Sequence, residues 1–332
     1  MRIALVKLSA LGDIIHAMVV LQFIKKNNKK IYIDWIVDEK YKELLEFHPD
    51  INKVFVVKLQ NAKKKKSIRL FLMELYKTHQ LNKYDLVIDM QGLVKSALIA
   101  RMIPSRTTLG FDKFSIRENI ASIFYQKSFR IPYDLNIINR NCRLIKNAID
   151  VEISSEDVEK KLPYLYYKNK YFCADLSTEK KNIILIPGAS NESKRYPATH
   201  FAELVNTIDA NFLIIWGSLN EKVLAEEIKM RSPSAKICKK LTLESLISLI
   251  SQVDLVIGPD SGPTHMAWAM NVPSITLFGP TPGFRNAFET NINRVIESES
   301  IVNPFRIDKN DYSIKNIKTS EIAKLTNQLI RD

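Results

Sequence analysis

The chain has 332 residues, which is enough for two α/β domains of about 150 residues each. Its hydrophobic fraction of 46% and mean hydropathy of -0.11 are typical of a folded globular protein and exclude a disordered chain. The net charge of +13 is uneven, because residues 1–150 hold 27 Lys and Arg against 14 Asp and Glu, whereas residues 151–332 hold 22 of each. This polarity predicts that the first half meets nucleic acid, an anionic membrane surface or a phosphorylated substrate; a merely well-solvated basic surface is the alternative.

Short apolar runs alternate with segments of helical spacing along the whole chain. In the first half, strands are expected at Ile3–Lys7, Ile31–Val37, Val54–Val57 and Asp85–Asp89, and helices at Asp13–Ile24, Ile68–His79 and Leu93–Met102. In the second half, strands are expected at Ile183–Pro187, Phe212–Trp216, Leu255–Ile257 and Ser274–Leu277. Helices are expected there at Pro197–Thr207, Glu221–Met230, Leu243–Ser251 (capped by Thr242), Pro263–Met270 and Thr319–Ile330.

This alternation predicts parallel sheets covered by helices on both faces. The fold class is therefore α/β, with two Rossmann-like domains facing across a cleft and a closing C-terminal helix. The domains are predicted at residues 1–155 and 164–332. Apolar residues 1–20 are interrupted by Lys7, Asp13 and His16, so a first strand and helix are expected here rather than a signal peptide. The sequence has no uninterrupted run of 18 apolar residues, so no membrane-spanning helix is predicted.

Three segments combine small and polar residues directly after predicted strands, where ligands bind in such sheets. In Lys7–Asp13, Gly12 permits a tight turn and Asp13 is either a helix cap or a functional carboxylate. Pro187–Lys194 offers small residues and one lysine for phosphate oxygens. Ile257–His265 has two glycines and several polar side chains and is typical of a diphosphate site.

Several motifs are absent. No GxGxxG follows a strand, no Asp-x-Asp pair is available to hold a metal-bound diphosphate, and no GxSxG elbow occurs. The histidines and the three cysteines lack metal-ligand spacing, so we expect no metal site and free thiols in a reducing cytoplasm.

Six motifs in this order and spacing are similar to those of the lipopolysaccharide heptosyltransferase family of GT-B-fold enzymes. They are VKLSALGDIIHA, DMQGLVKSA, SKRYP, IIWGSLNE, GPDSGPTHMAWAM and LFGPTPG. The resemblance covers residues from Met1 to about 285, and the Ser-x-x-Gly-Asp-x-x-His form of the first motif resembles the first heptosyltransferase rather than the second. Ala189 departs from the pattern where the family tends to carry a hydroxyl, and Pro263 departs from it after Gly262.

The resemblance implies transfer of heptose from ADP-L-glycero-β-D-manno-heptose onto Kdo of Kdo-lipid A, with inversion and without metal or cofactor. It implies that Asp13 is the general base, that Lys194 and the Asp260–His265 segment hold the diphosphate, and that Glu221 contacts the donor's ribose. An inverting displacement requires one carboxylate to take the acceptor's proton and separate positive stabilisation for the departing diphosphate. The catalytic residues expected are Asp13 and Lys194.

The full set of expected contacts follows from these motifs and from the basic first half. Donor contacts are expected at Ser190, Lys194, Glu221, Leu241, Asp260, Ser261, Gly262, Pro263 and His265. Acceptor contacts are expected at Ser9, Gly12, Lys63, Lys64, Lys66, Gln91, Arg117 and Arg143, and further acceptor or membrane contacts at Lys65, Arg69, Lys95 and Arg140. The lysines of residues 63–66 are equally consistent with a solvated loop.

The expected partners are ADP-heptose, Kdo-lipid A and the anionic inner-membrane surface, with the protein peripheral on the cytoplasmic face; no nucleic acid and no obligate protein partner are expected. Two alternatives stay open. One is another GT-B transferase with a different donor or acceptor, such as heptosyltransferase II. The other is a nucleic-acid-binding protein that uses the basic half, although residues 63–66 have no aromatic neighbour before Phe71.

Overall fold

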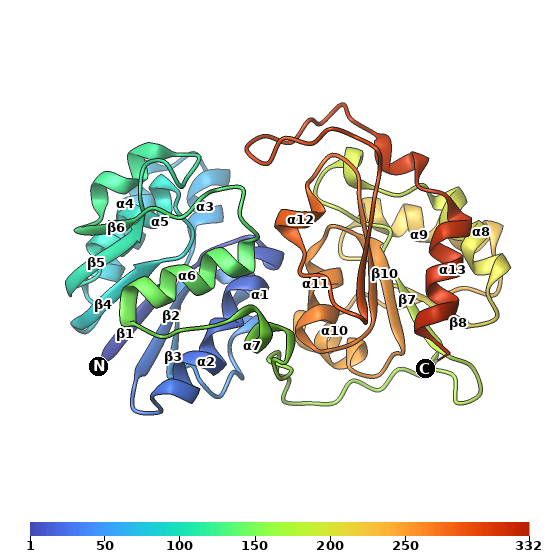
Figure 1. The fold of residues 1–332 in the computed structure, drawn as a ribbon, viewed down its shortest axis with the longest axis horizontal. Coiled ribbons are helices and arrows are strands. Elements are labelled where there is room, and N and C mark those ends of the chain that lie inside the picture. Colours follow the sequence, from blue (N-terminus) through green and yellow to red (C-terminus); the bar gives the residue numbers. More distant parts are fainter. Residues whose placement is uncertain (332) are drawn as a thin grey trace. The chain divides into compact units, whose positions relative to one another are not determined.

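The computed structural model describes residues 1–331, without the side chain of Lys63. The chain divides into two compact units, Met1–Tyr164 and Leu165–Asp332, and each is built on one six-stranded parallel sheet (Figure 1). Residues 156–163, which lie between the two predicted domains, belong to the first unit. There the Tyr164 hydroxyl donates to the carbonyl of Ile15 at 3.0 Å, and the Leu162 N–H donates to Gln22 Oε1 at 3.0 Å.

The first sheet has the order β3-β2-β1-β4-β5-β6, and every neighbouring pair is parallel. Val6 in the central strand pairs with Ile36 on one side and Asp89 on the other. Near-continuous apolar runs form these central strands because helices cover both faces of the sheet. The strands are β1 (Arg2–Val6), β2 (Tyr32–Asp38), β3 (Lys53–Val57), β4 (Tyr84–Asp89), β5 (Ser105–Phe111) and β6 (Lys127–Phe129).

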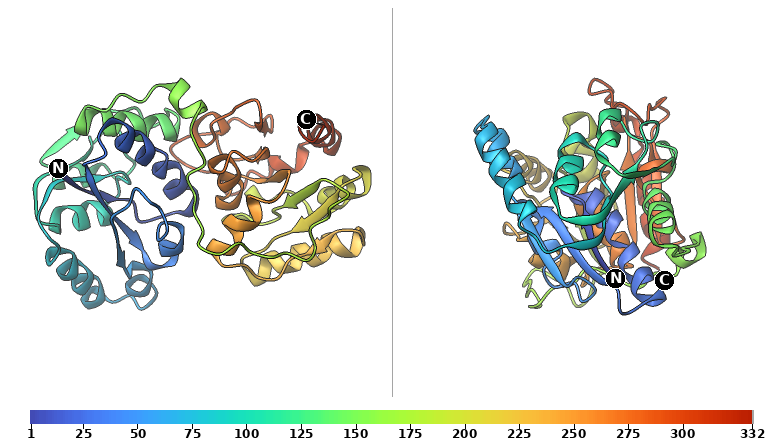
Figure 2. Two further views of the ribbon diagram at one scale, coloured as in Figure 1. Left: turned by 90° about the horizontal axis from the view of Figure 1, so that it is seen from below. Right: turned by 90° about the vertical axis from the view of Figure 1, so that its left-hand side faces the viewer.

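Helices of the first unit follow the strands in alternation (Figure 2). The single helix predicted at 13–24 is wrong in detail: two helices are separated by Val19, whose backbone keeps helical angles, so the break is local. The helices are α1 (Leu11–Met18), α2 (Val20–Asn27), α3 (Leu59–Lys64), α4 (Ile68–His79), α5 (Val94–Met102), α6 (Ile137–Ile149) and α7 (Ser155–Glu159), with short 3-10 helices η1 (Glu39–Leu44) and η2 (Asn119–Phe124).

The second sheet has the order β12-β11-β10-β7-β8-β9 and is also parallel throughout. Its core contains the buried rings of Phe201 and Phe212 together with apolar side chains of the closing helix, such as Ile322. The strands are β7 (Asn182–Leu185), β8 (Asn211–Ile214), β9 (Lys236–Ile237), β10 (Leu255–Pro259), β11 (Ser274–Phe278) and β12 (Asn293–Glu297).

The helices of the second unit begin close to where they are predicted. Thr242 caps α10 as expected, since its hydroxyl accepts from the Ser245 N–H at 3.1 Å. The helices are η3 (Glu192–Lys194), α8 (Ala198–Thr207), α9 (Leu219–Arg231), α10 (Leu243–Ile250), α11 (Gly262–Ala269), α12 (Gly283–Asn286), η4 (Ser313–Asn316) and α13 (Thr319–Leu329).

The two sheets share one topological feature that positions the candidate site. In the first sheet β1 lies between β2 and β4, and in the second β7 lies between β8 and β10. The connections from the two strands at each such point therefore run in opposite directions and leave a crevice at the strands' carboxyl ends. The β1–β4 and β7–β10 boundaries are therefore the positions where a ligand is expected to bind in each sheet.

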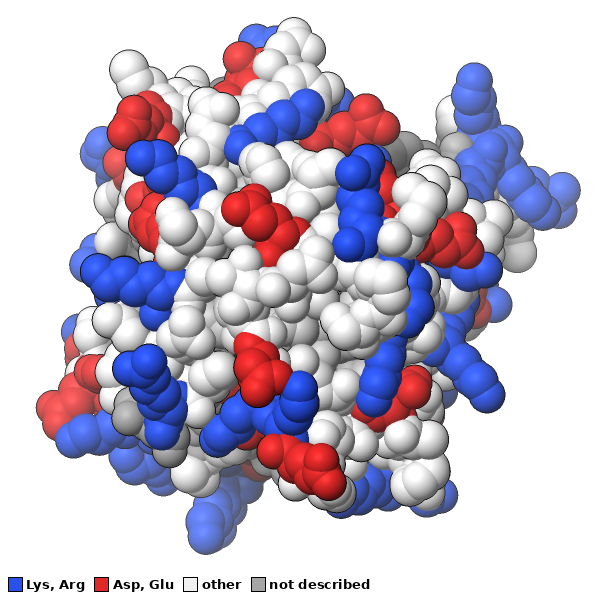
Figure 3. All heavy atoms as spheres, turned by 90° about the vertical axis from the view of Figure 1, so that its right-hand side faces the viewer, with Lys and Arg blue, Asp and Glu red and all other residues white. Residues whose placement is uncertain are grey.

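Basic and acidic residues are equal in number in the second half of the sequence. The face drawn in Figure 3 carries Lys and Arg interspersed with Asp and Glu. Among the described residues, no helix is long and apolar enough to cross a bilayer.

A buried histidine makes the first unit sensitive to acid. Burial lowers the pKa of His48 to about 3, and its Nδ1 accepts from the Asp50 N–H at 3.2 Å. Because the unfolded chain takes up this proton near pH 6.5 and the folded chain does not, stability is full above pH 6.5 and falls as the pH drops toward 3.

We expect His48→Asn, which keeps an acceptor for Asp50, to remove about 2.5 kcal/mol of the stability loss between pH 7 and pH 4.5. Urea unfolding at pH 7 and at pH 4.5 measures it. An equal loss of stability on acidification in the variant and the unmodified chain would show that His48 is not the responsible group.

Candidate functional site

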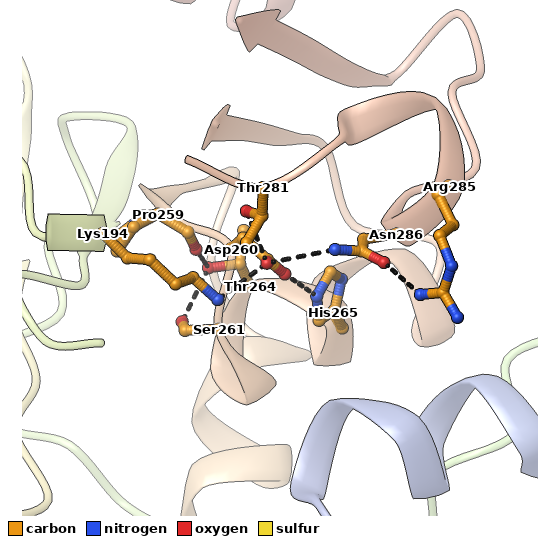
Figure 4. A network of polar contacts seen from close by, with 9 residues as sticks. All are labelled: Lys194, Pro259, Asp260, Ser261, Thr264, His265, Thr281, Arg285 and Asn286. Carbon is orange, nitrogen blue, oxygen red and sulfur yellow. Dashed lines mark hydrogen bonds and ion pairs between the residues drawn. The ribbon is translucent and has the colours of Figure 1, made fainter. Parts of the chain in front are cut away.

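The carboxylate of Asp260 lies at the centre of a buried polar cluster in the second unit (Figure 4). Asp260 directly follows β10, and its Oδ2 accepts from Lys194 Nζ at 2.7 Å. Its Oδ1 lies 2.9 Å from Nε2 of His265, and this ring nitrogen carries the proton because a carboxylate can only accept. Lys194 belongs to the connection after β7 and His265 to α11, so the cluster spans the β7–β10 boundary. Three residues predicted as one donor site are thus brought together.

Two further side chains donate to the same carboxylate. The hydroxyl of Thr281 donates to Asp260 Oδ2 at 3.0 Å, and Asn286 Nδ2 lies 3.5 Å from that oxygen. Arg285 Nη1 in turn donates to Asn286 Oδ1 at 2.8 Å. These partners of Asp260 are not among the residues predicted from the sequence. Thr281 could have been found, because it lies in the LFGPTPG segment directly after a predicted strand.

The electrostatics of the cluster keep Asp260 ionised. Burial alone would raise the pKa of this carboxyl, but the charge of Lys194 and the hydrogen bond from His265 outweigh burial and hold the pKa well below its usual range. The site therefore contains a fixed negative charge at any working pH. That charge holds the Lys194 ammonium group, which has three N–H donors, in one place.

The start of α11 contributes a turn with backbone donors. Ser261 Oγ and Thr264 Oγ1 lie 3.1 Å apart, and the Thr264 hydroxyl donates to the carbonyl of Pro259 at 2.8 Å. Gly262 begins the helix and Pro263 occupies its first turn, where the N–H that proline lacks has no helical partner to lose. The early N–H groups of a helix favour an anion.

Glu221 lies beside the loop that follows β7, at the start of α9. Its Oε2 accepts from the N–H groups of Gly217 at 2.6 Å and Ser218 at 3.0 Å, which closes the helix's first turn. A Cβ added to Gly188 would lie 2.4 Å from Glu221 Cδ, so a larger residue there would have to displace the Glu221 side chain. Ser190 is exposed and Leu241 half-buried, and among the described contacts neither joins the Asp260 cluster.

In the first unit, Gln91 ties the end of β4 to the loop after β1. Its Oε1 accepts from the N–H groups of Leu8 at 2.7 Å and Ser9 at 3.2 Å, and its Nε2 lies 3.5 Å from Ser9 Oγ. The structure thus brings together the predicted residues Gln91 and Ser9 at the β1–β4 boundary. The side-chain carbonyl of Gln91 is engaged with backbone, which makes it a positioning group for this loop.

A buried carboxylate fixes Gln91 itself. Asp89 Oδ1 accepts from the Gln91 N–H at 2.8 Å, and its Oδ2 accepts from the hydroxyls of Ser96 and Tyr125, each at 2.7 Å. Burial raises the pKa of Asp89 against the effect of these donors. Asp89 lies in the quoted motif DMQGLVKSA, but its role in fixing Gln91 follows only from the fold.

Asp13 is exposed in the first turn of α1. Of the two roles considered for it, that of the N-cap residue does not apply, because the helix begins at Leu11 after the capping residue Ala10, and Gly12 is already helical. Asp13 Oδ2 instead accepts from the Ala10 N–H at 3.1 Å, as an acidic residue at the third helical position does.

Two buried groups that the sequence did not single out lie near Asp13. Burial raises the pKa of Asp38, at the end of β2. The pKa of Tyr41 is raised by burial and then by the charges of Asp38 and Asp13, so Tyr41 lies within electrostatic reach of both carboxylates. No local motif marked Asp38 or Tyr41.

The predicted basic contacts are dispersed over the first unit. Lys64, Lys66 and Arg117 are exposed, and the side chain of Lys63 lies outside the described part of the structure. Arg143 lines a hollow of about 540 Å³ beside α6. Among the described side chains, no hydrogen bond or ion pair joins Lys64, Lys66, Arg117 or Arg143 to Asp13.

The expectation that Arg140 contacts the acceptor or the membrane is wrong. Its guanidinium is buried and donates to the carbonyls of Pro132 at 2.6 Å, Ser115 at 2.9 Å and Ile131 at 3.2 Å. It holds the loop after β6 and is not placed to contact an acceptor or a membrane. In the described residues, no group of three or more His, Cys, Asp and Glu could hold a metal ion, and Cys142, Cys173 and Cys238 are free and buried.

We expect Asp260→Asn to destabilise the second unit by about 3–5 kcal/mol, because it leaves the buried charge of Lys194 without its counterion. Hydrogen exchange of peptides from β10 and α11 measures this loss. Glu226→Gln, which breaks the exposed pair with Lys222, is the control and should change stability by less than about 1 kcal/mol. Equal protection in both variants would show that the cluster does not organise these loops.

Comparison with known proteins places the chain in a family. The family model for glycosyltransferase family 9 (heptosyltransferase) matches residues 72–307. Lipopolysaccharide heptosyltransferase 1 of Campylobacter coli is 41% identical over 354 residues, covering 100% of both chains, and that of Pseudomonas aeruginosa is 29% identical, covering 87% of this chain and 81% of its own.

Solved structures show the same fold. The Escherichia coli heptosyltransferase WaaC with ADP has a TM-score of 0.80 at 21% identity, covering 99% of this chain and 100% of its own. A glycosyl transferase family 9 structure from Veillonella parvula has a TM-score of 0.83 at 19% identity, covering 99% and 97%. The predicted GT-B fold with its two parallel sheets is confirmed. Through the family model and the full-length relative, the chain belongs to glycosyltransferase family 9, the heptosyltransferases.

Proposed function

We propose that the chain transfers L-glycero-D-manno-heptose from ADP-heptose onto Kdo of Kdo-lipid A, in lipopolysaccharide inner-core synthesis, with inversion and without a metal. The observation that carries this proposal is the 41% identity, over the full length of both chains, to a protein named lipopolysaccharide heptosyltransferase 1. An ADP-heptose donor is supported by the similar fold of WaaC, which has been solved with ADP and with ADP-2-deoxy-2-fluoro heptose.

The Asp260 cluster supports donor binding by the second unit. As the sugar leaves, negative charge develops on the diphosphate, and positioned cationic and N–H donors stabilise it most effectively. Lys194 supplies a charge that Asp260 holds in place, and the start of α11 supplies backbone N–H groups. In this role Ser261 and Gly262 present their N–H groups, and Glu221 is available to the donor's ribose.

Asp13 is the candidate general base in the first unit. A carboxylate on a rigid helix, beside the loop that Gln91 holds, is suited to take the proton of the attacking acceptor hydroxyl.

The basic first half supports an anionic acceptor. Kdo-lipid A carries acidic sugars and phosphates at a membrane, and the exposed Lys64, Lys65, Lys66 and Arg69 offer positive charge without a fixed ligand geometry. We place the enzyme at the cytoplasmic face of the inner membrane as a peripheral protein. Turnover of ADP-heptose with purified Kdo-lipid A tests the whole proposal, with heptosylated Kdo-lipid A as the competing acceptor that a heptosyltransferase II would prefer.

Asp13→Asn should lower the transfer rate about 10²–10⁴-fold while keeping an acceptor for the Ala10 N–H. The thermal midpoint and the affinity for ADP should change little, because the substitution is exposed and lies outside the donor-binding unit. Steady-state kinetics measures the loss. Near-normal turnover in this variant would remove Asp13 from the catalytic role.

Lys194→Met should lower turnover roughly 10²-fold or more, by loss of a positioned charge on the leaving group. Because this change also strands the Asp260 carboxylate, the matched control is the double variant Lys194→Met with Asp260→Asn. The double variant should recover stability but not activity. Activity of the unmodified enzyme should survive EDTA, and restoration of an EDTA-inhibited enzyme by Mg²⁺ would contradict the metal-free mechanism.

A further inference from the structure

Helix α4 presents apolar side chains to solvent. Ile68 is 76% exposed, Leu72 56% and Tyr76 62%, and their spacing of four residues places them in one row along the helix. Met73 lies beside that row and is 47% exposed. On a surface helix of a globular protein this outward row is normally polar.

The orientation of α4 is fixed by its inward side. Glu74 is buried, and its Oε2 accepts from the Lys58 N–H at 3.0 Å while its Oε1 pairs with Lys77 at 2.6 Å. Leu75 packs into the core with the first unit's strands, and Thr78 is buried next to it. The polar Glu74 and Thr78 therefore point inward and the apolar row points outward, so the row cannot be buried by a rotation of the helix.

Positive charge adjoins this row on its N-terminal side. Residues 59–73 hold five Lys and Arg and no Asp or Glu. Of these, Lys64, Lys65, Lys66 and Arg69 are exposed. A basic segment that runs into an apolar helix face, with an aromatic residue in it, is typical of a helix lying in the interface of an anionic bilayer.

A second exposed apolar segment lies nearby in the same unit. α5 packs against α4 and also against η2. η2 exposes Ile120 at 59% and Ile123 at 71%, close in sequence to the exposed Arg117. The right view of Figure 2 shows α4 at the edge of its unit.

We propose that α4 is a membrane-docking helix, which inserts Ile68, Leu72 and Tyr76 into the interface of an anionic bilayer while the adjoining basic residues contact its headgroups. A second copy of the chain is the less suitable occupant, because self-association through this face would bring two basic segments together. The proposal rests on the proposed function only for the source of the bilayer, since the acceptor there is a lipid. Beyond the attraction between basic residues and an anionic acceptor in the proposed function, the docking helix supplies an apolar contact with the bilayer.

The test uses the full chain and vesicles without any acceptor lipid. Flotation with phosphatidylethanolamine vesicles, with and without phosphatidylglycerol, measures binding. We expect binding that requires phosphatidylglycerol and falls at least about tenfold in the variant with Ile68, Leu72 and Tyr76 each changed to Gln. The matched control changes Leu219 and Val223 to Gln, since these are 76% and 62% exposed on α9 of the second unit and should leave vesicle binding unchanged.

Two further measurements separate insertion from charge attraction. The fluorescence of a tryptophan introduced by Leu72→Trp should be quenched by lipids with brominated acyl chains, whereas that of a tryptophan introduced by Leu219→Trp should not. Changing Lys64, Lys65 and Lys66 to Gln should weaken binding mainly at low salt, because exposed charges are screened over about 8 Å at physiological ionic strength.

Unchanged vesicle binding in the glutamine variant of α4, or no quenching of Leu72→Trp, overturns the proposal. So does an oligomer in sedimentation without lipid that the same variant dissociates, because the row would then be a protein interface. Vesicle binding is read without heptose transfer, so a failure of the proposed reaction is seen separately as absent turnover. Transfer to a water-soluble, deacylated acceptor should be equal in the α4 variant and the unmodified enzyme, while transfer to the acceptor in vesicles should fall.

Discussion

The second unit depends on a single buried carboxylate. Asp260 follows the last residue of β10 and binds groups from three segments: Lys194 after β7, His265 in α11, and Thr281 after β11. These segments are distant in sequence and share only their place at the carboxyl edge of the sheet. An isolated carboxylate could not be buried there, and an isolated lysine could not be held there, so each makes the other's burial tolerable.

The first unit repeats the arrangement with weaker donors. Asp89 stands at the end of β4, the strand beside β1, as Asp260 stands after β10, the strand beside β7. Its partners are backbone N–H groups and the hydroxyls of Ser96 and Tyr125, rather than an ammonium group. Accordingly, Asp89 shapes a loop through backbone N–H groups and hydroxyls, whereas Asp260 orders a positive charge. The difference accords with the roles proposed for the units, acceptor binding in the first and stabilisation of the leaving diphosphate in the second.

The strands that could be predicted are those whose sequence is almost wholly apolar, such as β1, β7, β10 and β11. β5 escaped prediction because its sequence, SRTTLGF, is polar where the strand starts, and β9 because it is two residues long. Lys194, Asp260 and His265 could be predicted as one site because their two segments each follow a strand and the family resemblance assigns both segments to the diphosphate. Asp38, Tyr41 and Asn286 could not, since their relevance arises from burial and from contacts between distant segments. Arg140 was misassigned because a basic residue gives no sign in sequence that carbonyl groups enclose it.

The most direct test of this account is a crystal structure of the full chain with ADP. The account predicts that diphosphate oxygens lie within hydrogen-bond distance of Lys194 Nζ and of the first N–H groups of α11. It also predicts that Asp260 keeps its contacts with His265 and Thr281 and that no metal ion lies between Asp260 and the phosphates. A diphosphate bound away from Lys194, or bridged to Asp260 by a metal ion, would contradict it.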